Sequence, residues 1–153
     1  MEKTNVLRAL DQAHIKYDFH EYDNTEMNGE NVAKLLNEDV NQVFKTLVTI
    51  SNTKEHFVFI IPVNETLNLK KAAKAAKVKS IEMIKQKELF PLTGYVHGGC
   101  SPIGMKKEFK SFINETAILF DTILVSGGRI GLQIEINPDD LKEYIKAEYV
   151  DIV

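Results

Sequence analysis

The stretch KTLVTISNTKEHFVFIIP, residues 45–62, decides the fold class of this chain. Residues 45–50 and 56–61 are rich in β-branched and aromatic side chains, which favour extended strands. The polar residues 51–55 between them are typical of a turn, and Pro62 ends the second run because it has no amide hydrogen for a sheet. The sequence therefore predicts a β-hairpin in this stretch.

Helical and strand patterns follow one another irregularly on both sides of this hairpin. Amphipathic or alanine-rich spacing predicts helices over residues 6–15, 40–44, 69–76, 84–90 and 138–147, and over a segment that begins after Asn28. The predicted caps are Thr4 or Asn5 for the first helix, Asn28 for the second and Asn137 for the last, and Pro91 is the predicted stop of the helix over 84–90. Further strands are predicted over residues 17–22, 122–126 and 131–136. Because neither regular strand–helix alternation nor an all-strand pattern results, we expect a single α+β domain, residues 1–153, in which helices wrap a mixed, barrel-like β-sheet.

The composition excludes several classes of protein. The chain has 153 residues, of which 44% are hydrophobic and 27% charged, as is typical of one globular domain. Cys100 is the single cysteine, so neither an internal disulfide nor a four-cysteine metal site can form. The histidines show no metal-ligand spacing, and the charged N-terminus and short apolar runs predict neither a signal peptide nor a membrane span. We therefore expect a cytoplasmic protein without a metal or a cofactor.

Positive charge is concentrated in one part of the chain. Residues 66–110 hold ten lysines and three acidic residues, a local charge of +7. Since the whole chain has a net charge of −3, the remainder carries −10. Such asymmetry indicates a side that faces a polyanion, although a solvated lysine-rich helix gives the same pattern.

Three segments hold the candidates for chemistry. In VFKTL, residues 43–47, Lys45 stands at the start of an apolar strand, where it either extends to solvent or faces a cleft as a charge for a phosphate or a carbonyl oxygen. In GYVHGGCSPIG, residues 94–104, the glycines form either a surface turn or a nest of backbone amides. In VSGGRIGLQIEI, residues 125–136, the chain forms either a plain hairpin or a turn that holds Ser126 beside a substrate.

Nucleophilic catalysis has weaker support. Ser126 lies outside the G-x-S-x-G pattern of a hydrolase elbow. Cys100 follows His97 by three residues, but residues so spaced in a loop rarely meet in the geometry that a nucleophile and its base require. A thiol or serine hydrolase that uses Cys100 or Ser126 stays an alternative.

Taken together, QVFKTL, LNLKK, GYVHGGCSPIG and VSGGRIGLQIEI resemble, in this order, the YbaK/EbsC family of free-standing Cys-tRNA(Pro) deacylases. That family is related to the editing domain of bacterial prolyl-tRNA synthetases. The resemblance covers nearly the whole chain. It implies a trans-editing enzyme that releases cysteine from mischarged Cys-tRNA(Pro), and it makes prolyl-tRNA synthetase a possible partner.

The resemblance also implies roles for single residues. The implied catalytic residues are Lys45, Gly98 and Gly99, the glycines through their amides around the aminoacyl ester, and the implied substrate-binding residues are Tyr22, Thr46 and Ser126. Two departures bear on the choice of amino acid: Met27-Asn28 stands where related sequences have a phenylalanine, and Gln133 where they read GLDIE. From the charge pattern we expect tRNA phosphates to be bound by lysines near the pocket, namely Lys70, Lys71, Lys106 and Lys107.

Members of the resembled family are thought to use the thiol of the cysteinyl ester itself, which attacks the ester carbonyl and closes a thiolactone. Such a site needs to bend the substrate and stabilise an oxyanion, and it needs no nucleophile or metal of its own. Two alternatives stay open: an Ala-tRNA(Pro) deacylase that uses water, and a non-catalytic module that binds tRNA or a protein partner.

Overall fold

The computed structural model describes residues 2–22, 29–36 and 38–153. The helices in these ranges are α1 (Asn5–Gln12), α2 (Gly29–Leu35), α3 (Leu69–Ala76), α4 (Leu89–Thr93) and α5 (Pro138–Ile145). The strands are β1 (Tyr17–Glu21), β2 (Phe44–Ser51), β3 (His56–Pro62), β4 (Ile81–Met83), β5 (Lys110–Asn114), β6 (Ile123–Ser126), β7 (Leu132–Ile136) and β8 (Glu148–Val150). Short 3₁₀ turns cover Val40–Gln42, Gln86–Glu88 and Glu115–Leu119. None of these helices is long and apolar enough to cross a membrane.

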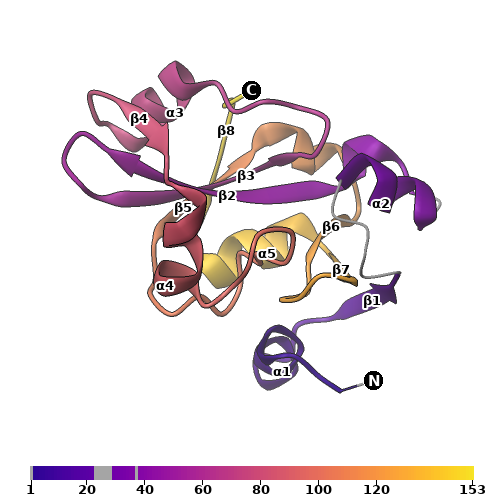
Figure 1. The fold of residues 1–153 in the computed structure, drawn as a ribbon. Helices are drawn as coiled ribbons and strands as arrows, with labels where there is room; N and C mark the ends of the chain where they lie inside the picture. The colour runs from indigo at the N-terminus through magenta and orange to yellow at the C-terminus, as the bar shows by residue number, and fades with distance from the viewer. Residues whose placement is uncertain (1, 23–28, 37) are drawn as a thin grey trace.

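The strands form two sheets (Figure 1). The larger sheet has the strand order β4-β2-β3-β5-β8. Strand β2 pairs antiparallel with β4 and with β3, whereas β5 pairs parallel with β3 and with β8. The smaller has the order β1-β7-β6 and is antiparallel throughout. The predicted α+β class with a mixed sheet and surrounding helices is confirmed. The barrel-like closure is corrected, because the two sheets stay open and meet at an isolated bridge between Val43 and Leu124.

The predicted hairpin is confirmed as β2 and β3, and its strand β3 is buried on both faces. Val58 and Ile60 point into the main core, which also contains α1 and α5. Phe57, Phe59 and Ile61 point the other way and pack with α3, which covers the opposite face of the sheet (Figure 1). A strand covered on both faces needs apolar residues at every position, which explains the continuous run.

Side-chain caps fix the helix starts where the sequence predicts them. Thr4 caps α1 by accepting from the amide of Leu7 at 3.3 Å. Asn137 caps α5 by accepting from the amides of Asp139 and Asp140, and Pro138 follows as the first helical residue. The predicted cap at Asn28 lies outside the described residues, as does the departure at Met27-Asn28.

Two predictions about local structure are wrong. In place of the predicted helix at 84–90, two residues without regular structure follow β4 and lead into a 3₁₀ turn and the start of α4, and Pro91 lies inside α4 instead of ending a helix. The ring is accommodated because Pro91 is the third residue of α4, where an amide has no intrahelical acceptor. Strands β5 and β8 are not predicted at all, since their parallel pairing with β3 and with each other depends on contacts between distant residues.

Candidate active site

A pocket of about 300 Å³ opens between β2, the glycine loop 94–104 and the ends of β6 and β7. It brings together the three segments that the sequence singles out. Its wall is completed by apolar residues of α2, α4 and the chain after β3. The lining residues are Tyr22, Val32, Val43, Phe44, Lys45, Thr46, Leu47, Val63, Leu89, His97, Gly98, Cys100, Ser126 and Gln133.

Most of the residues to which the resemblance assigns a role meet in this pocket. The ones that line it are Tyr22, Lys45, Thr46, Gly98 and Ser126. Lys45 is half-buried near the start of β2, opposite Ile61 of β3. The pocket thus combines a lysine, a glycine backbone and hydroxyl groups within an apolar wall. The sequence does not predict this apolar wall, which includes Val32, Val63 and Leu89. These residues belong to separate elements, and no pattern along the chain shows that such residues become neighbours.

Two buried oxygen atoms in the pocket have no hydrogen-bond partner among the described residues. They are Oγ1 of Thr46 and Oε1 of Gln133. Gln133 is only 7% exposed, and its amide nitrogen donates to Oη of Tyr22 at 3.4 Å. An unpaired buried polar atom is costly, and both residues that carry these oxygens line the pocket. Gln133 therefore belongs to the pocket despite its departure from related sequences.

The two glycine segments touch at Gly99, which does not line the pocket. A Cβ atom on Gly99 would lie 2.9 Å from the backbone nitrogen of Ile130 and 3.0 Å from the Cα of Arg129. The Gly99 amide donates to the Val96 carbonyl at 3.0 Å, so it is already paired. For the neighbouring Gly98 amide, with φ of 86°, no acceptor is found in the described part of the chain. Gly98 is thus the better placed of the two to donate to a ligand.

Replacing Gly99 with alanine is expected to lower the free energy of unfolding by about 1–3 kcal/mol, because the added methyl group must push two backbone segments apart. Urea denaturation of the variant measures this loss. Thr66→Ala, at an exposed site, is the control and should unfold like the parent protein. Unchanged stability of Gly99→Ala would contradict the tight contact between the loops.

Nucleophilic catalysis by the protein finds little support in the pocket. Burial raises the pKa of the Cys100 thiol to about 12, with a smaller opposing effect from a hydrogen bond to Thr93. The thiol is therefore protonated at neutral pH and unreactive. Ser126 accepts a hydrogen bond from the amide of Gly128 at 3.2 Å, and within the described ranges neither a histidine nor a carboxylate bonds to its hydroxyl. Among the residues that the structure describes, no activating base of the kind that a nucleophile requires is bonded to either side chain.

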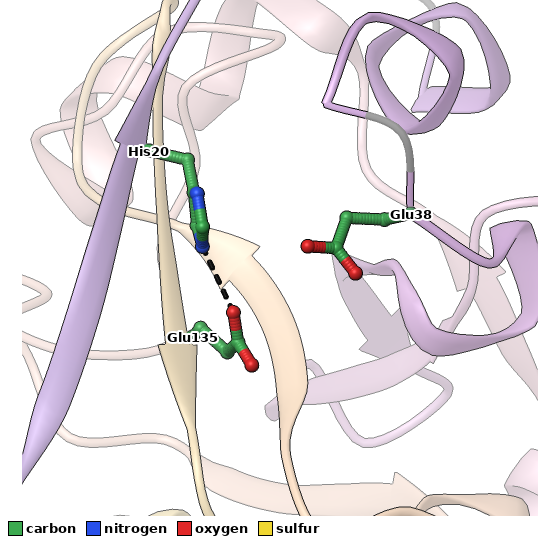
Figure 2. Close-up of side chains that lie close together, drawn as sticks. All are labelled: His20, Glu38 and Glu135. Atoms are coloured by element: carbon green, nitrogen blue, oxygen red, sulfur yellow. Dashed lines mark hydrogen bonds and ion pairs between the residues drawn. The ribbon is translucent and has the colours of Figure 1, made fainter.

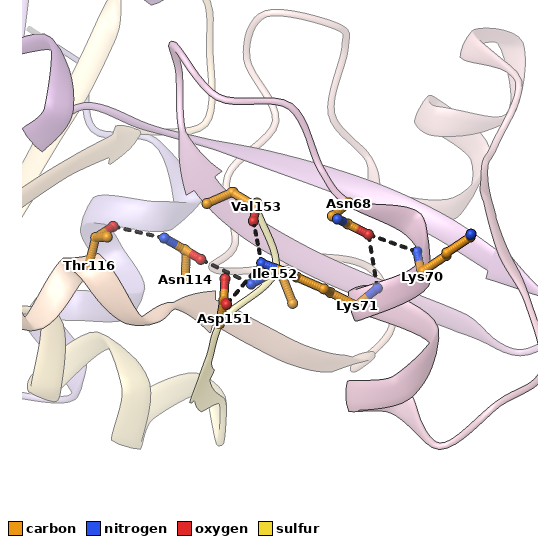
Figure 3. Close-up of polar contacts among 8 residues, drawn as sticks. All are labelled: Asn68, Lys70, Lys71, Asn114, Thr116, Asp151, Ile152 and Val153. Carbon is orange, nitrogen blue, oxygen red and sulfur yellow. Dashed lines mark hydrogen bonds and ion pairs between the residues drawn. The ribbon is translucent and has the colours of Figure 1, made fainter.

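None of the four lysines that are expected to bind tRNA near the pocket is among its lining residues. Lys70 and Lys71 lie in the first turn of α3, which Asn68 caps (Figure 3). The Lys71 ammonium donates to Oδ2 of Asp151 at 2.9 Å and to the Val153 carbonyl at 2.8 Å. The ammonium of Lys106 lies 5.1 Å from the ring centre of Phe90, and Lys107 lines a second cavity beside the end of α5. The sequence showed where positive charge is concentrated but not which way each side chain points.

The fold and its pocket define a small α+β domain of the kind that edits aminoacyl-tRNA. The family model described as the aminoacyl-tRNA editing domain matches residues 25–144. The chain belongs to this family. It is 40% identical over 153 residues, 99% of this chain and 93% of the relative, to EbsC of Enterococcus faecalis (strain ATCC 700802 / V583), named as a candidate Cys-tRNA(Pro)/Cys-tRNA(Cys) deacylase.

Solved structures share the fold. A crystal structure of a candidate trans-editing enzyme for prolyl-tRNA synthetase superposes with a TM-score of 0.85 at 20% identity, covering 99% of this chain and 98% of that one. A crystal structure of a hypothetical protein superposes with a TM-score of 0.90 at 20% identity, covering 97% and 99%. At this level of identity the likeness concerns the fold.

Proposed function

We propose that this chain is a trans-editing deacylase that releases cysteine from mischarged Cys-tRNA(Pro). The observation that carries the proposal is the pocket, whose lining includes Lys45, Thr46, Gly98 and Gln133. Its volume of about 300 Å³ suits an aminoacyl group and leaves the tRNA body outside. The 40% identity to EbsC, named for Cys-tRNA(Pro) and Cys-tRNA(Cys), supports the same substrate class.

The reaction we propose uses the substrate's own thiol. The cysteinyl sulfur attacks the ester carbonyl, a carbon–sulfur bond forms, and the carbon–oxygen bond to the terminal ribose breaks. The thiol proton passes to the ribose oxygen, so the products are a thiolactone and uncharged tRNA. In this step the Lys45 ammonium and the Gly98 amide stabilise the oxyanion, and the pocket holds the substrate bent. This chemistry classes the enzyme as a lyase, whereas attack by water would make it a hydrolase.

The Cys100→Ala variant is expected to deacylate Cys-tRNA(Pro) within about tenfold of the parent rate, a loss of no more than ~1.4 kcal/mol in the barrier. The reason is that a buried, protonated thiol takes no part in a reaction whose nucleophile comes from the substrate. Single-turnover deacylation assays measure the rate. An acyl-enzyme trapped on Cys100 would contradict the mechanism.

We further propose that the choice of tRNA(Pro) depends on a partner, with prolyl-tRNA synthetase as the candidate, in the cytoplasm where tRNA is charged. The lysines of residues 66–110 do not line the pocket, and the acidic remainder of the chain opposes their field beyond a Debye length of about 8 Å. Each contact with a phosphate of a single strand adds only ~0.7 to the slope of log K for tRNA binding against log salt concentration. A few such contacts therefore give weak binding.

The isolated chain is therefore expected to bind tRNA weakly, with a shallow salt dependence and little preference among tRNA species. A salt titration of binding, repeated with several tRNAs, measures both properties. Tight binding with a steep slope and a strong preference for tRNA(Pro) would show that the chain selects its tRNA unaided.

The experiment that tests the proposed function is incubation of Cys-tRNA(Pro) with the purified chain. Accelerated release of cysteine, lost in a folded pocket variant, supports an enzyme. Binding of the charged tRNA without release would favour the non-catalytic module instead.

A further inference from the structure

Beside the pocket, three side chains that can bind a metal converge from three different elements (Figure 2). His20 lies on β1, Glu135 on β7 and Glu38 in the segment that follows α2. Nε2 of His20 lies 2.8 Å from Oε1 of Glu135, and the Glu38 carboxylate faces both from the other side. One donor atom from each of the three lies within 4.8 Å of the other two.

The strand register explains this arrangement. His20 is paired with Gln133 across β1 and β7, and Glu135 follows Gln133 by two residues. Because side chains alternate along a strand, His20, Gln133 and Glu135 project from the same face of the smaller sheet. The unpaired, buried oxygen of Gln133 is on this face too. None of the three converging residues lines the pocket, so the cluster is separate from the site described above.

Glu135 is held in place as metal ligands usually are. Its Oε2 accepts from the hydroxyl of Thr122 at 2.6 Å. The amide of Gln42 in turn donates to the Thr122 hydroxyl at 3.2 Å and to the Thr122 carbonyl at 2.8 Å. The bond from Thr122 occupies Oε2 of Glu135, so Oε1 is the oxygen directed at His20 and Glu38. Such outer hydrogen bonds fix the orientation of a ligand before the ion arrives.

The charges in the cluster are unbalanced. Glu135 brings one carboxylate to this space. A second carboxylate, that of Glu38, lies in the same half-buried space. His20 carries at most one positive charge against these two negative ones. A divalent cation would neutralise the pair.

We propose that His20, Glu38 and Glu135 bind one divalent transition-metal ion of the Zn²⁺ class. One imidazole nitrogen and two carboxylate oxygens are a donor set that suits Zn²⁺, whereas Mg²⁺ and Ca²⁺ prefer oxygen donors alone. The ion ties the segment after α2 to β1 and β7, and thereby steadies the pocket wall to which α2 contributes Val32. Its role is structural. The proposal does not rest on the proposed function and stands whatever the pocket binds.

The test begins with the full chain stripped of metal by a chelator and dialysed. Calorimetric titration with Zn²⁺ is expected to give one ion per chain, and the melting temperature is expected to rise with Zn²⁺ but not with the same concentration of Mg²⁺. Glu38→Gln and His20→Asn should each weaken Zn²⁺ binding by about tenfold or more. Thr122→Val, which removes the hydroxyl that donates to Glu135 and accepts from Gln42, should weaken it by about tenfold.

Glu82→Gln and His14→Asn are the matched controls, because both residues are exposed and lie outside the cluster. They should bind Zn²⁺ like the parent protein. In the absence of metal, Glu38→Gln should melt at the same or a higher temperature, since it relieves repulsion between two carboxylates. The proposal is overturned if the parent protein does not bind Zn²⁺, or if folded Glu38→Gln and His20→Asn bind it as tightly as the controls.

Discussion

The Lys45→Ala variant is expected to release cysteine from Cys-tRNA(Pro) about 10²-fold more slowly than the parent protein, or slower still. Lys45 lines the pocket near the start of β2, where its ammonium is the cationic group suited to a developing oxyanion. A compact charge held in a partly desolvated site stabilises such an anion far more than water does. Single-turnover deacylation at saturating enzyme measures the chemical step directly.

Lys70→Ala is the control for this variant, because Lys70 is exposed at the start of α3 and does not line the pocket. It should keep nearly the parent rate. The Lys45→Ala protein should stay folded, which circular dichroism and thermal unfolding check, because a half-buried lysine adds little to an apolar core. A folded Lys45→Ala protein that turns over normally would exclude this lysine from the reaction.

Seryl-tRNA(Pro) is expected to be a very poor substrate even though serine is nearly isosteric with cysteine. A pocket alone separates such similar side chains by about 100-fold at most, so a larger ratio must come from chemistry. A thiol ionises more readily than a hydroxyl and attacks carbonyl carbon better, so the cysteinyl ester can react with itself and the seryl ester cannot.

The comparison uses both amino acids on the same tRNA(Pro) and measures their release at the same enzyme concentration. Analysis of the quenched cysteine product for a thiolactone adds a direct view of the chemistry. Equal turnover of the two esters would refute the role of the substrate thiol and favour attack by water.

The elements that the sequence predicts well are those with local signals. The hairpin of β2 and β3 follows from β-rich runs around a polar turn, and the caps Thr4 and Asn137 follow from their side chains alone. Strands β5 and β8 carry no comparable pattern, because a parallel partner is chosen by tertiary contacts. The helix stop predicted at Pro91 is wrong because a proline is tolerated in the first turn of a helix as well as after its end.

The residues of the candidate site also divide into those with a local sequence signal and those without one. Lys45, Thr46 and Ser126 belong to segments whose glycine and strand patterns can be recognised along the chain, and all three line the pocket. Gly99 belongs to the same glycine-rich segment as Gly98, but it packs against the backbone of Arg129 and Ile130. The spacing of glycines along the chain does not predict this difference. In the separate cluster proposed to bind a metal, Glu38 lies near His20 only because two distant segments are brought against β7, so the spacing of residues along the sequence does not predict this cluster.

The central claim, that this chain edits cysteine from tRNA(Pro), is tested most directly by comparing cysteine and alanine release from the same tRNA. Cys-tRNA(Pro) and Ala-tRNA(Pro) are incubated separately with the purified chain, and the fraction of charged tRNA is followed over time. Rapid loss of cysteine with alanine retained at the rate of the buffer control is the predicted result. Loss of alanine as fast as cysteine, or loss of neither, would contradict the account.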